Sequence, residues 1–302
     1  TKKMKFDIIG KRYFWFALSI LITVPGLLSI AVQGFNLGID FTGGTLLDLK
    51  FARPVTVAEV RDVMKDVHME GSTIQLVANE QVDAAPNVFI RTGVLSEEQR
   101  RDIMTDMTAK LGHYDLLRVE KVGPTIGAEL TKNAVWALLL SWATIIAYIT
   151  YRFEFKFAIS GILALVHDVL VVLGIFSIFQ IEIDSAFVAA LLTIVGFSIN
   201  DTIVIFDRIR ENLKNHRKAE NIHELVNRSI WQTMTRSIYT VLTVLFVTLA
   251  LYLFGGDTTK NFSLAMLIGF ASGAYSSIFF ASPLWVTFKD HEGNKRKSAK
   301  AS

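Results

Sequence analysis

Hydrophobic positions along the chain gather into six long blocks that are separated by polar loops. The blocks lie at about residues 13–33, 134–151, 157–179, 185–206, 237–254 and 262–288. A helix that crosses the hydrocarbon core of a bilayer needs roughly 20 predominantly apolar residues, and each block is close to that length. The pattern therefore predicts an α-helical membrane protein with six transmembrane helices.

The polar stretch at residues 34–133, between the first and second blocks, has a different periodicity. It predicts strands at 45–51, 72–78, 87–92 and 115–122 and helices at 56–68 and 96–111. Each helix start carries a capping box, Thr56 with Glu59 in one and Ser96 with Gln99 in the other. The order strand-helix-strand-strand-helix-strand (βαββαβ) is that of a ferredoxin-like α+β domain. Apolar residues at helical spacing indicate its core: Val57, Val60, Met64, Val67, Ile103, Met107 and Leu111.

Composition agrees with a membrane protein. Hydrophobic residues make up 51% of the 302 residues, which is too apolar for an ordinary soluble domain. Basic residues before the first block could mark a signal peptide, but the apolar run is longer than a signal core of roughly 7–15 residues. The exit Ala31-Val32-Gln33 also lacks the A-x-A pattern, so we predict a retained anchor, which Pro25 should bend. The chain has no cysteine, which excludes disulfides and thiolate metal sites.

Basic residues in the short loops predict the orientation of the spans. Nineteen Lys and Arg residues fall on one side, in the N-terminus, the loop at 152–156, the segment 208–236 and the tail. The opposite short loops contain only Lys260. Both termini are therefore predicted to be cytoplasmic, and residues 34–133 extracytoplasmic. The run Lys295-Arg296-Lys297 could bind nucleic acid or anionic lipid, but a solvated tail that sets the topology is favoured.

These patterns divide the chain into four predicted parts. Residues 1–33 are the cytoplasmic N-terminus and first span, and residues 34–133 are the external domain. Residues 134–288 hold spans two to six, with a cytoplasmic amphipathic segment at 208–236, where apolar and charged residues alternate as in helices that lie at a membrane surface. Residues 289–302 form a basic tail.

The third block contains an ionisable residue, Asp168. At ~1.5 Å per residue it lies roughly 16 Å from each end of the block, near the membrane midplane. A charged group there costs at least ~2.5–3.5 kcal/mol, so it is by default a functional hypothesis. We predict that Asp168 takes up and releases protons; the alternative is a permanently protonated side chain that makes a structural hydrogen bond. His167 points about 100° away on a helix, toward another neighbour, for packing or as a proton relay.

The fourth block carries a second polar group, Asn200 and Asp201, about five residues from its cytoplasmic end. On a helix Asp201 and Arg208 share one face, and Asn200 and Asp207 another. Arg208 could extend toward the interface and pair with Asp201 or Asp207, which would be a structural role. For Asp201 we favour a functional role, whereas Asp207 and Arg208 stay open between the two.

Two further motifs concern packing and turns. Gly269, Gly273 and Ser277 recur every four residues in the sixth block, which allows a close helix contact, within this chain or with a partner. The loop Gly38 to Gly44 ends in a double glycine that permits positive φ. It lacks the Gly-Lys-Ser/Thr ending of a phosphate loop, so a turn from span to domain is favoured over a binding element.

Catalytic and metal-binding chemistry is not indicated. In the external domain His68 and His113 stand singly, and the chain has no Ser, His and Asp signature and no His pair at metal-ligand spacing. We therefore predict no enzyme activity, no cofactor and no metal site.

Three motifs resemble those of a known family. They are the loop Gly38-Ile39-Asp40-Phe41-Thr42-Gly43-Gly44, the pair His167-Asp168, and Gly196 to Val204 running into Asp207-Arg208-Ile209-Arg210-Glu211-Asn212. Together they resemble the SecD/SecF family of bacterial protein-export membrane proteins, in particular its SecF members, within the resistance-nodulation-division superfamily. The resemblance covers essentially the whole chain.

The resemblance implies a function and partners. SecF pairs with SecD in a twelve-span unit that is associated with the SecYEG channel in the bacterial inner membrane, and YajC and YidC are further expected partners. The unit uses the proton motive force to promote translocation and release of preproteins. Carried over, Asp168 would be the proton-path carboxylate, with Asn200, Asp201 and Arg208 near it. Phe197 and Phe206 stand where relatives often carry other residues.

Two alternatives remain at this stage. One is a subunit of a proton-coupled exporter of small molecules or lipids, although such exporters usually join two six-span halves and larger external domains in one chain. The other is a scaffold subunit of the translocon, for which neutralising Asp168 would leave export unchanged.

Overall fold

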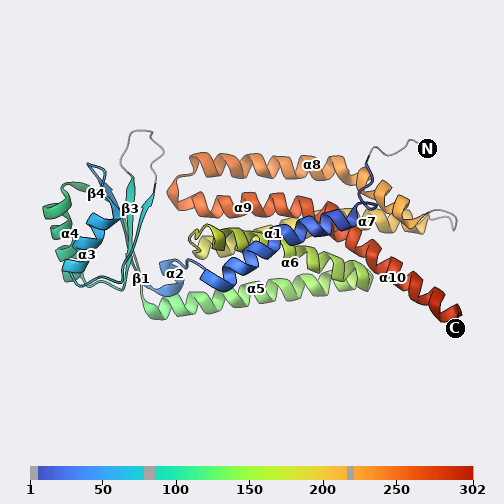
Figure 1. Cartoon of the computed structure of the whole chain (residues 1–302), viewed down its shortest axis with the longest axis horizontal. Helices are drawn as coiled ribbons and strands as arrows, with labels where there is room; N and C mark the ends of the chain where they lie inside the picture. Colours follow the sequence, from blue (N-terminus) through green and yellow to red (C-terminus); the bar gives the residue numbers. More distant parts are fainter. Residues whose placement is uncertain (1–5, 78–85, 216–220, 302) are drawn as a thin grey trace. The chain divides into compact units, whose positions relative to one another are not determined.

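A computed structural model describes residues 6–77, 86–215 and 221–301 of the chain (Figure 1). This part contains six helices that are long and apolar enough to cross a membrane. The first five are α1 (Arg12–Gln33), α5 (Pro124–Arg152), α6 (Phe155–Ile178), α7 (Ser185–Lys214) and α8 (Ile222–Phe254). The sixth runs through α9 (Asp257–Tyr275), the π-helix η1 (Ser276–Ala281) and α10 (Ser282–Ala301). Every predicted block lies in one of these helices.

The chain divides into two compact units, residues 37–135 and the remainder. The smaller unit starts with the short helix α2 (Ile39–Thr42) and holds a four-stranded antiparallel sheet in the order β2-β3-β1-β4. Its elements are β1 (Gly44–Phe51), α3 (Val57–Asp66), β2 (Thr73–Val77), β3 (Asn87–Thr92), α4 (Glu97–Leu111) and β4 (Tyr114–Val122). Strands and helices follow in the predicted order, with ends that differ from the prediction by at most two residues. Ala78, the predicted last residue of the second strand, lies outside the described residues.

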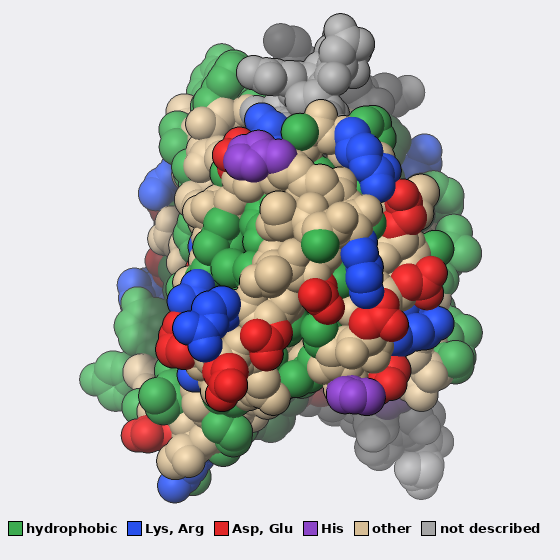
Figure 2. Space-filling model, turned by 90° about the vertical axis from the view of Figure 1, so that its left-hand side faces the viewer, with side chains coloured by type: hydrophobic (Ala, Val, Ile, Leu, Met, Phe, Trp, Pro, Cys, Tyr) green, Lys and Arg blue, Asp and Glu red, His purple; other side chains and the backbone are tan. Residues whose placement is uncertain are grey.

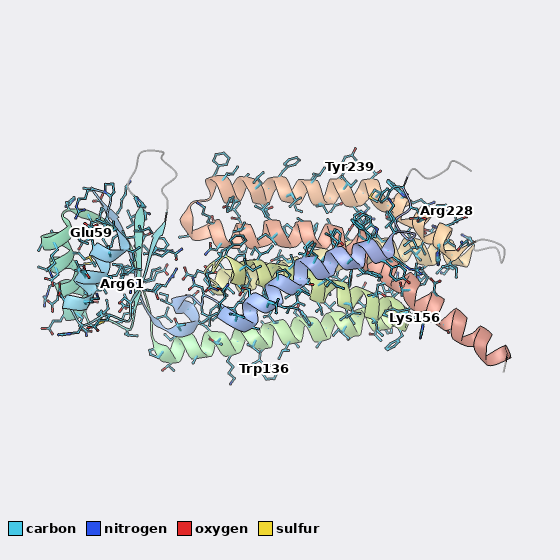
Figure 3. All side chains as sticks on the ribbon, viewed as in Figure 1. Glu59, Arg61, Trp136, Lys156, Arg228 and Tyr239 are labelled. Atoms are coloured by element: carbon cyan, nitrogen blue, oxygen red, sulfur yellow. The ribbon has the colours of Figure 1, made fainter. Side chains whose placement is uncertain are left out.

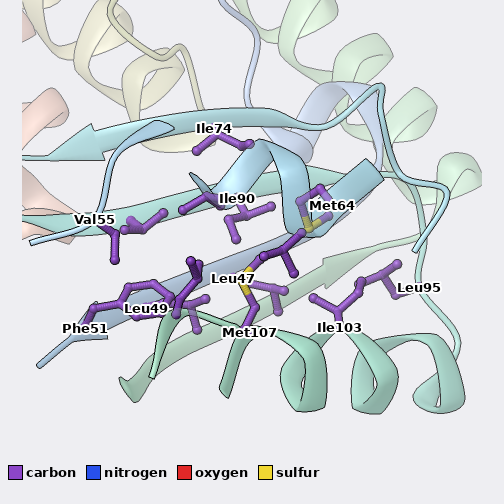
Figure 4. Packing of buried hydrophobic residues seen from close by; sticks show 14 residues of the cluster. Leu47, Leu49, Phe51, Val55, Met64, Ile74, Ile90, Leu95, Ile103 and Met107 are labelled. Carbon is purple, nitrogen blue, oxygen red and sulfur yellow. The ribbon is translucent and has the colours of Figure 1, made fainter. Parts of the chain in front are cut away.

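Helices α3 and α4 pack on one face of this sheet. Figure 4 shows Leu47 and Ile90 from the strands against Met64 of α3 and Ile103 and Met107 of α4, all of them buried. Their spacing is the helical periodicity seen in the sequence. The hydrophobic burial of these side chains is therefore what holds the two helices to the sheet.

Both predicted capping boxes are present. The Thr56 backbone N–H donates to Glu59 at 2.7 Å, and this bond holds the pKa of Glu59 below its usual value. The Ser96 N–H donates to Gln99 at 2.9 Å in the same way. Figure 2 shows acidic and basic side chains interspersed on one face of the molecule. Arg100 and Glu97 of α4 form an ion pair of 2.5 Å near the helix start.

In the larger unit, α6 and α7 are the most buried of the long helices, whereas α1, α5 and α8 are mostly exposed. Trp136 of α5 and Tyr239 of α8 point outward, with 62% and 65% of their surface exposed (Figure 3). Aromatic and aliphatic side chains that face outward along a long apolar helix are suited to contact with lipid or another apolar helix. Buried polar side chains of this unit are therefore expected mainly on α6 and α7.

Helix α1 crosses α6 at two glycines. A Cβ added at Gly26 would lie 2.6 Å from the Cα of Gly174, so neither position has room for a side chain. Next to this crossing, Ser29 and Ser177 share a hydrogen bond of 2.8 Å between their hydroxyl groups. Small residues and hydroxyls at a helix crossing are typical of membrane helices. The sequence analysis did not identify this crossing.

The segment 208–236 differs from its prediction as separate surface helices. Its described residues continue the spans, since α7 runs on to Lys214 and α8 starts at Ile222. Several of its apolar residues are buried, namely Ile209, Leu225, Val226 and Ile230, whereas Trp231 is exposed. The amphipathic pattern therefore reflects packing between helix extensions.

The π-helix in the sixth span has a local cause. Pro283 has no backbone N–H to donate to the carbonyl group of Phe279, and its ring would collide with that group in a regular helix. The wider turns of η1 immediately precede it. The Ser282 hydroxyl donates to the Ser277 carbonyl within this turn, at 3.2 Å. Beyond this point, the predicted tail continues as helix α10.

Candidate functional site

Asp168 lies near the middle of α6 and is fully buried. Its Oδ2 accepts hydrogen bonds from the Ser198 hydroxyl of α7 at 2.6 Å and from the Ser276 hydroxyl of η1 at 2.7 Å. Its Oδ1 accepts from the Ser272 hydroxyl of α9 at 2.7 Å. Three serines from three different segments thus converge on one carboxyl group. We refer to Ser198, Ser272 and Ser276 as the serine cage.

His167 belongs to the same site. Its Nδ1 lies 3.1 Å from Asp168 Oδ1, and its ring stacks on Phe280 with the centroids 5.2 Å apart. Its Nε2 is buried and has no hydrogen-bond partner among the described residues. The ring thus packs against other neighbours, Phe280 and Tyr275, and its Nδ1 also reaches Asp168, so packing and proton relay both stay open. The backbone directions differ by about 100°, but a side chain of this length can turn back to the carboxyl group.

The stripe Gly269, Gly273 and Ser277 faces α7. A Cβ at Gly269 would lie 2.4 Å from the Ile194 side chain, and one at Gly273 would lie 3.1 Å from the Cβ of Ser198. The Ser277 hydroxyl shares a hydrogen bond of 2.9 Å with Thr202. These contacts lie within the chain itself, and the close approach is what brings Ser272 and Ser276 within reach of Asp168.

Asp201 has a different environment. Its Oδ1 accepts a hydrogen bond from the Ser237 hydroxyl of α8 at 2.7 Å, while its Oδ2 is buried without a partner among the described residues. Arg236, the residue before Ser237, interacts electrostatically with Asp201. Asn200 is exposed, with no hydrogen bond in the described part of the chain. The structure thus places Asp201 in the interior and Asn200 on the outer surface of α7.

Arg208 does not pair with either aspartate that the sequence analysis considered. Its Nε donates to Gln232 of α8 at 2.6 Å, and its guanidinium pairs with Glu211 at 2.6 Å. Asp207 pairs instead with Arg210 at 3.0 Å and lies 3.7 Å from Arg152 of α5. Arg208 and Glu211 are three residues apart on α7, which places their side chains about one turn from each other, whereas Asp201 is nearly two turns from Arg208.

The glycine loop forms a tight turn. Gly43 and Gly44 have φ values of +71° and +132°, which side chains rarely adopt. A Cβ at Gly44 would lie 2.4 Å from the carbonyl oxygen of Thr92. On the other side the backbone of Asp40 and Phe41 approaches Gly127 at the start of α5 closely, with 3.1 Å from the Phe41 oxygen to an added Cβ. The loop therefore connects β1 to α5 by backbone contact.

Several residues of the site escaped the sequence analysis. They are the serine cage, Ser237 and Arg236. Serine is common in membrane helices, and its hydroxyl usually bonds to its own backbone. The only sequence signal was the spacing of Ser272 and Ser276, four residues apart on the face of the small-residue stripe. Among the described residues no group of three His, Asp or Glu side chains could hold a metal ion.

Comparisons with known proteins agree on one family. Residues 103–291 match the model described as protein export membrane protein SecD/SecF, C-terminal, and residues 28–55 match the SecD/SecF GG motif. The protein translocase subunit SecF of Acidaminococcus fermentans is 53% identical over 286 residues, which cover 94% of this chain and 98% of that protein.

Longer relatives contain the same region as a part. The protein translocase subunit SecDF of Bacillus subtilis is 37% identical over 98% of this chain and 40% of its own length. The crystal structure of SecDF, a translocon-associated membrane protein from Thermus thermophilus, matches with a TM-score of 0.86 at 37% identity. That match covers 95% of this chain and 39% of the SecDF chain. The chain thus spans about two fifths of the length of the SecDF relatives.

Proposed function

Because the chain belongs to the SecD/SecF family of protein-export membrane proteins, we propose that it acts as the SecF subunit of a protein translocase. In this function it pairs with SecD and uses the proton motive force to promote the passage of preproteins across the bacterial inner membrane and their release. It is a transport subunit and catalyses no covalent reaction.

The observation that carries the proposal is the buried carboxyl group of Asp168 in its serine cage. The cage has hydroxyl groups from α7, α9 and η1, so a change in the charge of Asp168 acts on three segments at once. One proton that moves through ~100 mV releases about 2.3 kcal/mol, and this is enough to bias two arrangements of a packed bundle. Asp168 therefore acts as the proton-binding group that couples to movement.

The other polar residues extend this path. Asp201, with Arg236 and Ser237 beside it, offers a second carboxyl group on α7, one turn from Ser198. His167 contacts Asp168 directly and can relay a proton. Arg208 and Asp207, which hold α7 to neighbouring helices, act at the end of the path rather than in it.

The small unit supports a mechanical role. We assign its βαββαβ order and antiparallel sheet to an extracytoplasmic ferredoxin-like domain between the first and second spans, with both termini in the cytoplasm. Protonation of Asp168 then biases a rocking of the six spans against those of SecD and moves this domain where preproteins leave the SecYEG channel. YajC and YidC are further partners under this proposal.

The first experiment replaces Asp168 by Asn and measures precursor export in cells at matched membrane levels with the proton gradient intact. We expect export to fall to the level of the deletion strain. Ser160→Ala is the matched control, because Ser160 is a buried residue of the same helix whose hydroxyl bonds to its own backbone at Lys156. Normal export by the Asp168→Asn variant contradicts the coupling role and favours a scaffold subunit.

Topology is testable because the chain contains no cysteine. Single cysteines at Glu98, on an exposed part of α4, and at Lys214, at the exposed end of α7, serve as probes. We expect a membrane-impermeant maleimide added to spheroplasts to label Glu98→Cys and to label Lys214→Cys only after lysis. The opposite result inverts the proposed orientation.

A further inference from the structure

The contacts of Asp168 differ between its two charge states. As a carboxylate it only accepts hydrogen bonds, and two groups face each of its oxygens: Ser198 and Ser276 at Oδ2, Ser272 and His167 at Oδ1. A protonated carboxyl group donates from one oxygen. On the Oδ1 side His167 Nδ1 can accept that bond in the tautomer that leaves it unprotonated, whereas a proton on Oδ2 requires a serine that donated there to turn its hydroxyl to another acceptor. The question is which one.

Ser276 has an alternative acceptor already in place. Its hydroxyl lies 3.2 Å from the carbonyl oxygen of Gly273, besides 2.7 Å from Asp168 Oδ2. In the part of the chain that the structure describes, Ser198 and Ser272 donate to Asp168 alone. Because a single O–H bond favours one acceptor at a time, protonation of Asp168 leaves Ser276 free to donate to Gly273 at little cost.

Ser276 also stands at a special place in the sixth span, as the first residue of η1. One turn further along the same segment, Phe280 stacks on His167. These two side chains attach the π-helix to the His167-Asp168 pair of α6. π-helical turns inside longer helices are frequently functional, and here Pro283 prevents a regular helix.

We propose that Ser276 is a positioning residue that holds η1, the segment from which α10 continues, against α6 while Asp168 is ionised and releases η1 when Asp168 is protonated. The inference rests on the proposed proton-coupled function. It also identifies the element that moves. A change in the charge of Asp168 alters its hydrogen bond with the Ser276 hydroxyl and thereby releases or holds the second half of the sixth span. Ser198 and Ser272 keep their bonds to Asp168 in both states and serve to hold α7 and α9 in place.

Other titratable groups near the site have to be separated from Asp168. On α6 itself this is His167, and on α9 it is Tyr275, whose hydroxyl donates to the Trp15 carbonyl of α1 at 2.8 Å. On α7 it is Asp201, and on α8 Arg236, which interacts with Asp201. Among the described residues, Tyr275, Asp201 and Arg236 make no hydrogen bond or ion pair with the Asp168 carboxyl group, so only His167 competes as the titrating partner.

The test measures the distance between α6 and α10 as a function of pH. Spin labels on Ile178→Cys and His291→Cys, both exposed, are expected roughly 30 Å apart from the helical rise along α6. Double electron-electron resonance on the protein reconstituted with SecD in nanodiscs should show a shift in the distance distribution between alkaline and acidic pH. The Asp168→Asn variant should show the acidic distribution at every pH.

The decisive variant is Ser276→Ala. We expect it to show the acidic distribution at all pH values, whereas Ser272→Ala, Asp201→Asn and His167→Asn retain the shift. Ser276→Thr restores the hydroxyl and should restore the shift. Ser263→Ala is the matched control, because Ser263 is a buried serine of α9 that bonds to its own backbone at Thr259.

Three results overturn the inference: no shift in the unmodified sequence, a full shift in Ser276→Ala, or a shift lost in His167→Asn. They are distinct from a failure of the proposed function, which shows as normal precursor export by Asp168→Asn. If Asp168→Asn blocks export while Ser276→Ala keeps the full shift, the proton role stands and the role of Ser276 falls.

Discussion

The two buried aspartates of the bundle, Asp168 and Asp201, lie in opposite kinds of environment. Asp168 is surrounded by the serine cage and His167, and its exposed surface is zero. Asp201 has one donor, Ser237, and an oxygen without a partner among the described residues. Buried polar groups are normally satisfied, so the two carboxyl groups differ in how far the described residues of this chain satisfy them.

The difference indicates a division of labour. A carboxyl group that several segments satisfy can act on a neighbouring segment when its charge changes, because a donor with another acceptor in reach, such as Ser276, can exchange its bond. A carboxyl group with a free acceptor position can exchange a proton without moving its neighbours. Under the proposed function, Asp168 is the carboxyl group that converts protonation into movement, and Asp201 the one that delivers the proton.

The largest expected effect comes from breaking the close packing beside Asp168. Gly273→Leu places a side chain where a Cβ already lies 3.1 Å from Ser198, and it pushes α9 away from α7. We expect a loss of about 3 kcal/mol of stability, from overpacking, and no export. Gly196→Leu is the control, since no atom lies within 4 Å of a Cβ there. Thermal unfolding in detergent measures both variants; equal midpoints contradict the importance of this contact.

A smaller effect separates the two carboxyl groups directly. In Asp168→Asn the amide nitrogen replaces an oxygen that faces donors, and we expect a loss of about 1–2 kcal/mol. In Asp201→Asn the amide nitrogen can take the place of Oδ2, which accepts no hydrogen bond from the described residues. The free energy of unfolding should therefore change by less than about 0.5 kcal/mol. The same unfolding assay applies. Equal losses in the two variants would remove the structural distinction between the sites.

The smallest effect concerns single hydroxyl groups. Ser237→Ala removes the one donor of Asp201, and Ser198→Ala removes one of several at Asp168. Because a hydrogen bond to a charged group contributes about 1.5–3 kcal/mol, the first variant should lose about 1.5 kcal/mol and the second about 0.5 kcal/mol, as neighbouring donors compensate. Chemical denaturation of purified protein compares the two. A larger loss for Ser198→Ala would show that the cage is not redundant.

Sequence analysis located the elements well, for reasons of local chemistry. An apolar block of about 20 residues is the length of a transmembrane helix and is recognised by its composition alone. The capping residues Thr56 and Ser96 bond to residues within one helical turn, so they are also recognised locally. Asp168 and Asp201 stood out because an ionisable residue in an apolar block is rare. Extended helix ends, such as α5 starting at Pro124, were missed because their first turns are polar.

The partners of each site residue were much less predictable. Pairing of Arg208 with Asp201 or Asp207 was one of the two roles left open, but Arg208 bonds to Gln232 of α8 and Glu211. Ser272 and Ser276 were not recognisable in the sequence, because a serine belongs to this site only if its hydroxyl oxygen lies within hydrogen-bond distance of the Asp168 carboxyl group. Gly26 and Gly174, almost 150 positions apart, are informative only as a pair.

The amino-acid sequence by itself determined where the chain forms spans, where the small α+β unit lies along it, and which carboxyl groups are buried in apolar surroundings. Those properties follow from hydrophobic burial and hydrogen bonding over a few residues. Only the tertiary structure decided that three serines close around Asp168, that Asp201 keeps an open acceptor, and that Ser276 faces two acceptors. Such contacts depend on how helices that are distant in sequence cross, because the donor–acceptor distance of a hydrogen bond tolerates a variation of only a few tenths of an ångström.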